Sequence, residues 1–394
     1  MMMPRSWDQL PPAVITPSHR SNNFDLIRLI AALQVVIAHA IGHTALLDTL
    51  SGWQRTAFDW FLEFPGVPVF FVISGFLIAR SYERSRDDPA GYAWRRCLRI
   101  FPALWVCLIV TIAVLAGFGF LTGGFVASST FWGWLAGQAT FVQFFNPEQF
   151  RDFGIGVANG ALWTITVELQ FYVFVPLLYA TFLGKWRGTA ANLLMAGIFA
   201  VSFLIYCRMD MEMNGPGGYA GTPMLWKLVF VTLAPHLWMF FLGIAIHRNF
   251  ESLAQWLEGK FVPYLAAYVI LLVISGMWLP DHSVAFYALH LPTRIVLALA
   301  TISAAYSARG LAGRLLGGTD VSYGVYIYHS IVINVLVELG QMRSLLSVVW
   351  VIFITGILAW VSWTFIEKPA LSHKADPLSG LWKRVSRRAR ALPE

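Results

Sequence analysis

Long apolar segments, each about as long as a lipid bilayer is thick, recur through this chain. A helix needs about 20 mostly apolar residues to cross a bilayer, and ten segments meet or approach that length. Backbone polar groups in lipid must be bonded within their own segment, so such runs predict helices. We therefore expect an all-α, polytopic integral membrane protein with about ten transmembrane helices, approximately 26–46, 64–80, 100–120, 162–183, 190–206, 227–246, 261–279, 284–307, 321–339 and 345–366.

The distribution of charge supports lipid as the main solvent. Only 12% of the 394 residues are charged and 57% are hydrophobic, whereas soluble domains carry about 25% charged residues. A core formed by a soluble chain of this length could not bury so much apolar surface.

The basic residues also predict an orientation. With the N-terminus in the cytoplasm, 21 of the 28 Lys and Arg residues lie on the cytoplasmic side and 6 on the outer side, as the positive-inside rule requires. Counting the short run 131–145 as a span would place the basic tail outside, so we interpret it as re-entrant or interfacial. Both termini are then cytoplasmic, and the chain divides into an N-terminal segment (1–23), a membrane domain (24–369) and a basic tail (370–394). The net charge of +7 thus indicates topology, and no nucleic-acid partner is expected.

Ionisable residues inside the first predicted span are the strongest functional candidates, because intramembrane charge is costly. Arg28 and His39 are eleven residues apart, which places them on one helix face about 16 Å apart, and Asp25 can pair with Arg28. A purely structural interpretation, with Arg28 reaching the interface and His39 bonded in the bundle, remains open. His43 follows His39 at i+4, but a metal needs at least a third ligand, so no metal site is predicted.

A carboxylate is expected at a similar depth to His39. Glu168 lies near the outer end of the fourth span, which places both groups roughly 20 Å from the cytoplasmic edge. The two could form a catalytic pair, or they could be two unrelated buried polar groups.

A cluster of arginines precedes the third span. Arg95, Arg96 and Arg99 could join Arg28 in a phosphate clamp, because guanidinium groups bind phosphate bidentately. Ordinary positive-inside charge is the alternative.

Other polar residues in the spans have weaker signals. Ser74 beside Gly75 favours close helix packing, although a nucleophilic role stays open. Tyr323 and His329 lie in the inner half of the ninth span, and His290 and Arg294 flank Pro292 in the eighth, where a kink could direct them to an outer cavity.

Taken in order, these motifs resemble acyltransferase family 3, a family of integral-membrane acyltransferases, many of which O-acylate surface glycans. The resemblance covers nearly the whole chain, from about 25 to 369. It rests on Asp25, Arg28 and His39; Gly66-Val67 with Phe70-Phe71-Val72-Ile73-Ser74-Gly75-Phe76-Leu77; Arg95-Arg96 to Pro102; Trp163 to Glu168 with Phe171-Tyr172; Ser322-Tyr323, Tyr326 and His329; and Glu367-Lys368-Pro369.

The resemblance implies transfer of an acyl group, expected to be acetyl, from cytoplasmic acyl-CoA to a hydroxyl of a glycan, exopolysaccharide or glycolipid at the outer side. Acyl-CoA is expected as a substrate, without a bound cofactor or metal. The expected setting is the bacterial inner (plasma) membrane, and a homo-oligomer is possible. The site residues then divide into catalytic candidates (His39 as general base, Glu168, Asp25), donor-binding candidates (Arg28, Arg95, Arg96, Arg99, Ser74, Tyr323, His329) and acceptor-side candidates (His43, His290, Arg294).

Two other functional classes remain compatible with the residues alone. Intramembrane His, Arg and Glu also form relays in transporters, although no inverted repeat of the transporter kind is evident. A catalytically silent membrane scaffold is the third class.

Overall fold

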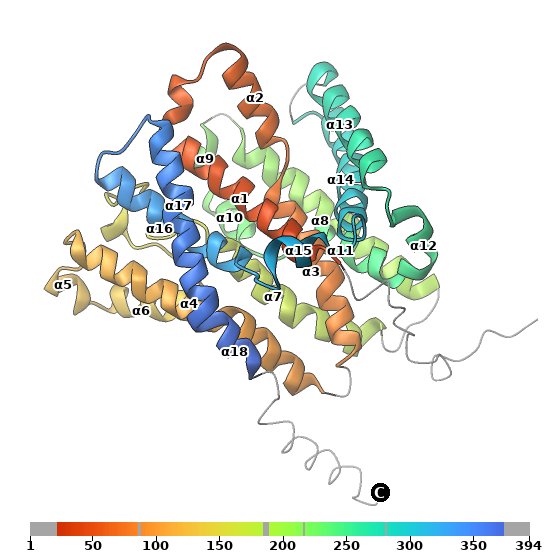
Figure 1. Cartoon of the computed structure of the whole chain (residues 1–394), viewed down its shortest axis with the longest axis horizontal. Coiled ribbons are helices and arrows are strands. Elements are labelled where there is room, and N and C mark those ends of the chain that lie inside the picture. Colours follow the sequence, from red (N-terminus) through yellow and green to blue (C-terminus); the bar gives the residue numbers. More distant parts are fainter. Residues whose placement is uncertain (1–21, 86–87, 184–188, 216, 280–281, 374–394) are drawn as a thin grey trace, which may run out of the picture.

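The structure is a computed structural model that describes residues 22–85, 88–183, 189–215, 217–279 and 282–373. Helices and connecting turns make up these ranges, with no strand among them (Figure 1). Most of the N-terminal segment 1–23 and of the basic tail 370–394 lies outside the described residues. The all-α expectation is confirmed.

Every predicted span contains a helix. The long helices are α1 (Phe24–His43), α3 (Gly66–Glu83), α4 (Pro89–Gly117), α7 (Trp163–Leu178), α8 (Thr189–Met213), α11 (Leu237–Arg248), α13 (Phe261–Trp278), α14 (Val284–Ala305), α16 (Ser322–Glu338) and α17 (Leu345–Ser362). Shorter helices connect or extend them: α2 (Gly52–Leu62), α5 (Gly123–Val126), α6 (Ser129–Ala139), α9 (Gly218–Gly221), α10 (Met224–Phe230), α12 (Phe250–Leu257), α15 (Leu311–Leu316) and α18 (Lys368–Ser372).

The expected count of ten spans is too high by the criteria of length and apolar composition. Seven helices of the described part qualify, or eight if the pair α12 and α13, bent by 85°, forms one span. The predicted span 227–246 is broken between α10 and α11, and α16 has only 17 residues. The run 131–145 forms the 11-residue α6, which is too short to cross a bilayer.

Helix α16 lies at the centre of the bundle. Its residues from Ser322 to Asn334 are all buried, and it packs against α1, α4 and α17. A helix buried on every side needs no lipid-facing stripe, so polar residues such as His329 and Asn334 can lie deep in the bundle, each fully buried.

Two glycines allow α3 and α11 to cross closely. A Cβ on Gly75 would lie 2.0 Å from the carbonyl oxygen of Phe240, and one on Gly243 would lie 2.1 Å from that of Val72. Small residues at such a crossing are the usual means of close packing in membranes. The interpretation of the Ser74-Gly75 pair as a packing feature therefore holds for Gly75.

The helix ends sort into two groups, as the predicted topology requires. At one end, the backbone NH of Asn23 donates to the carbonyl of Ala305, and the indole of Trp94 donates to the carbonyl of His373. At the other end, the NH of Arg343 donates to the carbonyl of Thr44. The relative placement of these loops agrees with the prediction, whereas the identity of the cytoplasmic face remains a prediction.

Candidate active site

The two imidazoles of His39 and His329 are hydrogen-bonded to each other. Nδ1 of His39, on α1, lies 2.9 Å from Nε2 of His329, on α16. The other ring nitrogen of His329, Nδ1, lies 2.6 Å from the backbone carbonyl of Tyr326. His329 is fully buried, so α16 holds its ring firmly against His39.

These contacts define which nitrogens carry protons. A carbonyl oxygen can only accept, so Nδ1 of His329 donates and its Nε2 is an acceptor. Nδ1 of His39 must then donate to that acceptor, which leaves the lone pair of His39 on Nε2. This assignment follows from the hydrogen-bond network. It makes Nε2 of His39 the available base.

Glu168 has partners other than His39. Its Oε1 accepts a hydrogen bond of 2.6 Å from the hydroxyl of Tyr172 and a long one of 3.5 Å from Ser74. No hydrogen bond within the described part of the chain joins Glu168 to His39. A catalytic pair of Glu168 and His39, one of the two alternatives left open by the sequence, therefore has no direct hydrogen bond here, and His329 is the group that orients the imidazole.

Two arginines converge on a carboxylate that the sequence analysis did not single out. Asp320, just before α16, lies 2.6 Å from Nη2 of Arg99 and 3.6 Å from Nη1 of Arg28. Arg28 also pairs with Asp25 at 3.3 Å. The expected meeting of Arg28 with Arg99 is thus observed, with Asp320 between them.

Asp320 is strongly held in its charged form. Burial raises the pKa of its carboxyl, but the charges of Arg99 and Arg28 and a hydrogen bond from Ser322 outweigh burial, so the pKa is lowered to about 2. The cluster of Arg28, Arg99, Asp25 and Asp320 is therefore close to neutral overall, which allows its cations to sit within the bundle.

Arg95 and Arg96 are not part of this cluster. Arg95 binds Ser85 at 2.7 Å and Asp88 at 3.4 Å. Arg96 binds Ser81 at 3.2 Å, and its guanidinium lies 5.5 Å from the centre of the Tyr172 ring. Because α4 begins at Pro89, these arginines belong to its first turns and not to a loop before residue 100.

A narrow cavity borders the arginine cluster, and neither His39 nor His329 is among the residues that line it. It contains about 70 Å³ and is lined by residues of α1, α3, α4, α7 and α16, namely Arg28, Val67, Phe70, Phe71, Ser74, Arg99, Thr164, Ile165, Glu168, Ser322, Tyr323 and Tyr326. Tyr326 also supplies the carbonyl that orients His329. The space holds a few water-sized groups, enough for a small acyl group. We call it the inner cavity.

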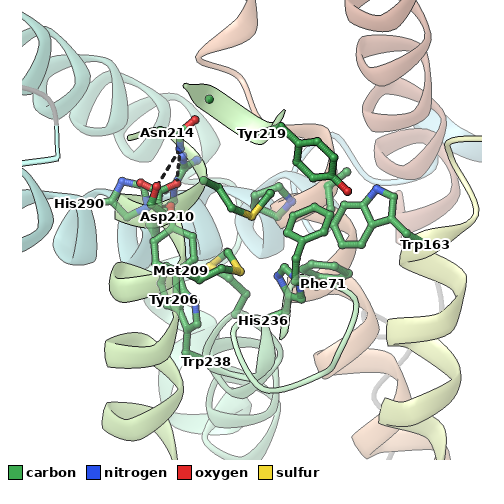
Figure 2. A pocket seen from close by; sticks show the side chains of 17 residues that line it. Phe71, Trp163, Tyr206, Met209, Asp210, Asn214, Tyr219, His236, Trp238 and His290 are labelled. Atoms are coloured by element: carbon green, nitrogen blue, oxygen red, sulfur yellow. Dashed lines mark hydrogen bonds between the residues drawn. The ribbon is translucent and has the colours of Figure 1, made fainter. Parts of the chain in front are cut away.

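The acceptor-side candidates His290 and Arg294 lie in a different place. They line a larger cavity of about 430 Å³ beside α8 and α11, shown in Figure 2, which we call the outer cavity. His43 is exposed, and its ring lies 5.5 Å from that of His39. Within the described residues, no group of three or more His, Cys, Asp or Glu is placed to hold a metal.

Three residues of the inner region had no site role assigned from the sequence. Tyr172 follows Glu168 at i+4, a spacing that could have indicated the pair. Asp320 precedes a helix whose Ser322 hydroxyl bonds to it at 2.6 Å. The hydroxyl of Thr164 donates a hydrogen bond of 2.9 Å to the hydroxyl of Tyr326. The two residues lie in distant segments, so no local sequence pattern predicts this contact.

Comparisons with known proteins identify the family of the chain. A family model described as an acyltransferase domain matches residues 21–367. Nodulation protein 10 of Rhizobium leguminosarum bv. viciae is 33% identical over 91% of this chain and 95% of its own. The O-acetyl transferase of Shigella phage Sf6 is 29% identical over 92% and 99%. The O-acetyltransferase OatA of Staphylococcus aureus is 23% identical over 84% of this chain and 56% of its own length. No solved structure matches.

Proposed function

The chain belongs to acyltransferase family 3, whose model covers residues 21–367, and is a multi-pass membrane enzyme; from this premise we propose that it O-acetylates a glycan or glycolipid with acetyl-CoA. The family decides against the transporter and scaffold alternatives. The acetyl group is supported by two relatives named as O-acetyl transferases. The observation that carries the proposal is the histidine pair itself, in which Nδ1 of His39 contacts Nε2 of His329 and the Tyr326 carbonyl holds the second ring.

The proposed reaction is direct transfer. Nε2 of His39 takes the proton of the acceptor hydroxyl as its oxygen attacks the thioester carbonyl carbon. The carbon–sulfur bond breaks, and the CoA thiolate receives the proton from His39. The products are the acetyl ester and CoA, and the histidine returns to its starting state.

The donor is placed with its phosphates towards Arg28 and Arg99. Guanidinium groups suit phosphate, and these two cations line the same cavity as Ser74 and Tyr323. Its volume of about 70 Å³ suits the acetyl thioester, so the nucleotide remains outside it. Arg95 and Arg96 do not line this cavity and are assigned a peripheral role.

Ser74 could in principle form an acyl-enzyme. Its hydroxyl has Glu168 at 3.5 Å, too far for an effective base. Direct transfer therefore remains the favoured route, and Glu168 with Tyr172 is assigned to shaping the cavity wall.

The proposed setting is the bacterial inner membrane, with the donor on the cytoplasmic side and the acceptor on the outer side. The start of α1, the α14–α16 connection and the end of α18 lie at one end of the bundle, which is the side that the basic residues predict to be cytoplasmic. Acetyl-CoA is a cytoplasmic metabolite, so Arg28 and Arg99 would meet it there.

The test is acetyl transfer by the purified protein in proteoliposomes. Release of CoA and acetylation of glycans from the source membrane are measured for the wild type, His39→Ala and His373→Ala. His373 is the control because it is an exposed histidine that follows α18. We expect a loss of at least a hundredfold in kcat for His39→Ala and wild-type rates for His373→Ala. Wild-type rates in folded His39→Ala protein would refute the mechanism.

A further inference from the structure

The outer cavity has the size and walls of a ligand site. Its volume of about 430 Å³ falls within the range of small-molecule pockets, about 300–1,000 Å³. Figure 2 shows Trp163, Tyr219 and Phe71 grouped on one side and Tyr206, Asp210 and His290 on the other. Such a space, lined by rings and a few polar groups, accommodates one or two sugar rings.

The aromatic rings that line the cavity pack against one another and against neighbouring rings. The Trp163 ring packs 4.2 Å from Phe230, and Phe71 packs 5.3 Å from His236. Opposite them, the rings of Tyr206 and His290 stack at 5.4 Å. Rigid rings with apolar faces and polar edges are well suited to hold a sugar by stacking and hydrogen bonding.

Arg294 is the unusual group in this cavity. Its Nε donates to Nε2 of His290 at 3.2 Å, while its buried Nη1 has no hydrogen-bond partner. No ion pair within the described residues involves Arg294. The Arg294 side chain lines the outer cavity, so a ligand there that supplies an anionic oxygen would pair with its charge.

The carboxylate in the same cavity is already occupied. Asp210 accepts hydrogen bonds from Tyr287 at 2.7 Å and Asn214 at 3.0 Å, and it faces His282 at 3.0 Å. Three partners therefore stabilise the charge of Asp210, whereas Arg294 has no anionic partner among the described residues. The charged group in this cavity that could still pair with a ligand is thus a cation, which favours an anionic ligand.

The outer cavity shares a wall with the inner one. Val67 and Phe71 line both. The preceding residue, Gly66, packs on Ala31 and Val35 of α1, and His39 follows Val35 by about one helical turn. A hydroxyl that passes Val67 from the outer cavity therefore enters the inner cavity.

We infer that the outer cavity binds the acceptor as an anionic sugar unit, stacked between the aromatic walls with its carboxylate or phosphate on Arg294. This inference rests on the proposed function for the identity of the ligand as an acceptor. The binding site itself stands on the cavity, its rings and a guanidinium that forms no ion pair within the described residues.

Direct binding to the full-length protein in nanodiscs tests the site without requiring transfer. The probes are methyl glucuronide, glucose 1-phosphate and the neutral methyl glucoside. We expect each anionic probe to bind at least about tenfold more tightly than the glucoside, and the tighter of the two to identify the source of the anion. Arg294→Gln should remove the preference and Arg294→Lys should keep part of it, while Arg343→Gln, an exposed cation on a loop, should have no effect.

Trp163→Leu is the second variant, in case Arg294→Gln fails to fold. It should weaken binding of the charged and neutral probes alike while preserving their ratio. Equal affinity of wild-type protein for all three probes, or an unchanged preference in folded Arg294→Gln, would overturn the inference. His39→Ala should bind the probes normally, so a protein that binds them through Arg294 but never transfers acetyl refutes only the proposed function.

Discussion

Nδ1 of His39 lies 2.9 Å from Nε2 of His329, although 290 residues separate them in the chain. The contact joins the first helix of the bundle to its buried central helix and leaves Nε2 of His39 free to accept a proton. His329 is thus a positioning residue, because it acts through the ring of His39 and has no need to touch the substrate.

Removal of the positioning histidine should lower turnover without weakening donor binding. For His329→Leu we expect kcat to fall about a hundredfold, because His39 loses the acceptor that fixes its tautomer. His329→Gln should retain more activity, since its amide oxygen can still accept from Nδ1 of His39. Steady-state kinetics, with kcat and the KM for acetyl-CoA determined separately for each variant, check this prediction. An equal loss in both variants, or a rise in the KM for acetyl-CoA alone, would contradict the positioning role.

The arginine cluster should discriminate between donors that differ in phosphate. Replacement of Arg28 by Gln should raise the KM for acetyl-CoA about tenfold, the cost of one charge-assisted contact. Acetyl-dephospho-CoA, which lacks the 3′-phosphate, tests whether Arg28 contacts that phosphate. If it does, the KM values of Arg28→Gln for acetyl-CoA and for acetyl-dephospho-CoA should be equal. Arg309→Gln, a cation of the α14–α15 turn, is the matched control and should keep wild-type KM values. Unchanged kinetics in Arg28→Gln would remove this arginine from the donor site.

Neutralising Asp320 should destabilise the protein in a pH-dependent way. Asp320→Asn leaves Arg99 and Arg28 without their shared partner, which costs about 3 kcal/mol for buried pairs. Because the pKa is lowered from 3.8 to about 2 in the folded state, the stabilisation is complete above about pH 4 and is lost as the pH falls towards 2. The difference in thermal midpoint between wild type and variant should therefore be constant from pH 7 to 5 and shrink below pH 4.

The control for this prediction is Asp48→Asn. Asp48 is 65% exposed and lies 4.0 Å from Arg343, a surface pair of the kind that contributes little. Its midpoint should match that of the wild type at every pH. An Asp320→Asn midpoint equal to that of the wild type at pH 7 would show that the pair has no stabilising role.

The crossing of α3 and α11 should tolerate no added methyl group. Gly243→Ala places a Cβ about 2.1 Å from the backbone oxygen of Val72, so the helices must separate, at a cost of about 1–3 kcal/mol. Gly356→Ala on α17 meets nothing within 4 Å and should be neutral or slightly stabilising. Thermal unfolding in detergent compares the two. Equal midpoints would mean that the crossing is loosely packed.

Sequence patterns identified the helices better than their contacts. Apolar runs located a helix in each predicted span, but they missed the first eleven residues of α4. They also could not reveal that the segment around Val231 breaks a helix or that α16 is enclosed by protein. Helix geometry alone predicts that Arg28 and His39 lie on the same face of α1. Their partners Asp320 and His329, by contrast, lie almost 300 residues away, and only the packing of α16 against α1 brings them together.

The arginines illustrate the same limit. Four cations near the cytoplasmic end predicted one clamp, yet Arg95 turns to Ser85 and Asp88 because α4 begins before it, at Pro89. Depth arguments likewise placed Glu168 near His39, but a carboxylate bonds to the nearest suitable donor, here Tyr172. Depth alone does not select a partner.

The burial of α16 on every side has a consequence for biogenesis. A helix that carries His329 and Asn334 gains little from facing lipid, and its packing partners include α17, which the ribosome makes afterwards. The enclosure of α16 is therefore complete only after α17, up to Ser362, has been synthesised. A chain that ends before α17 would leave the side of α16 that α17 covers without its protein neighbour.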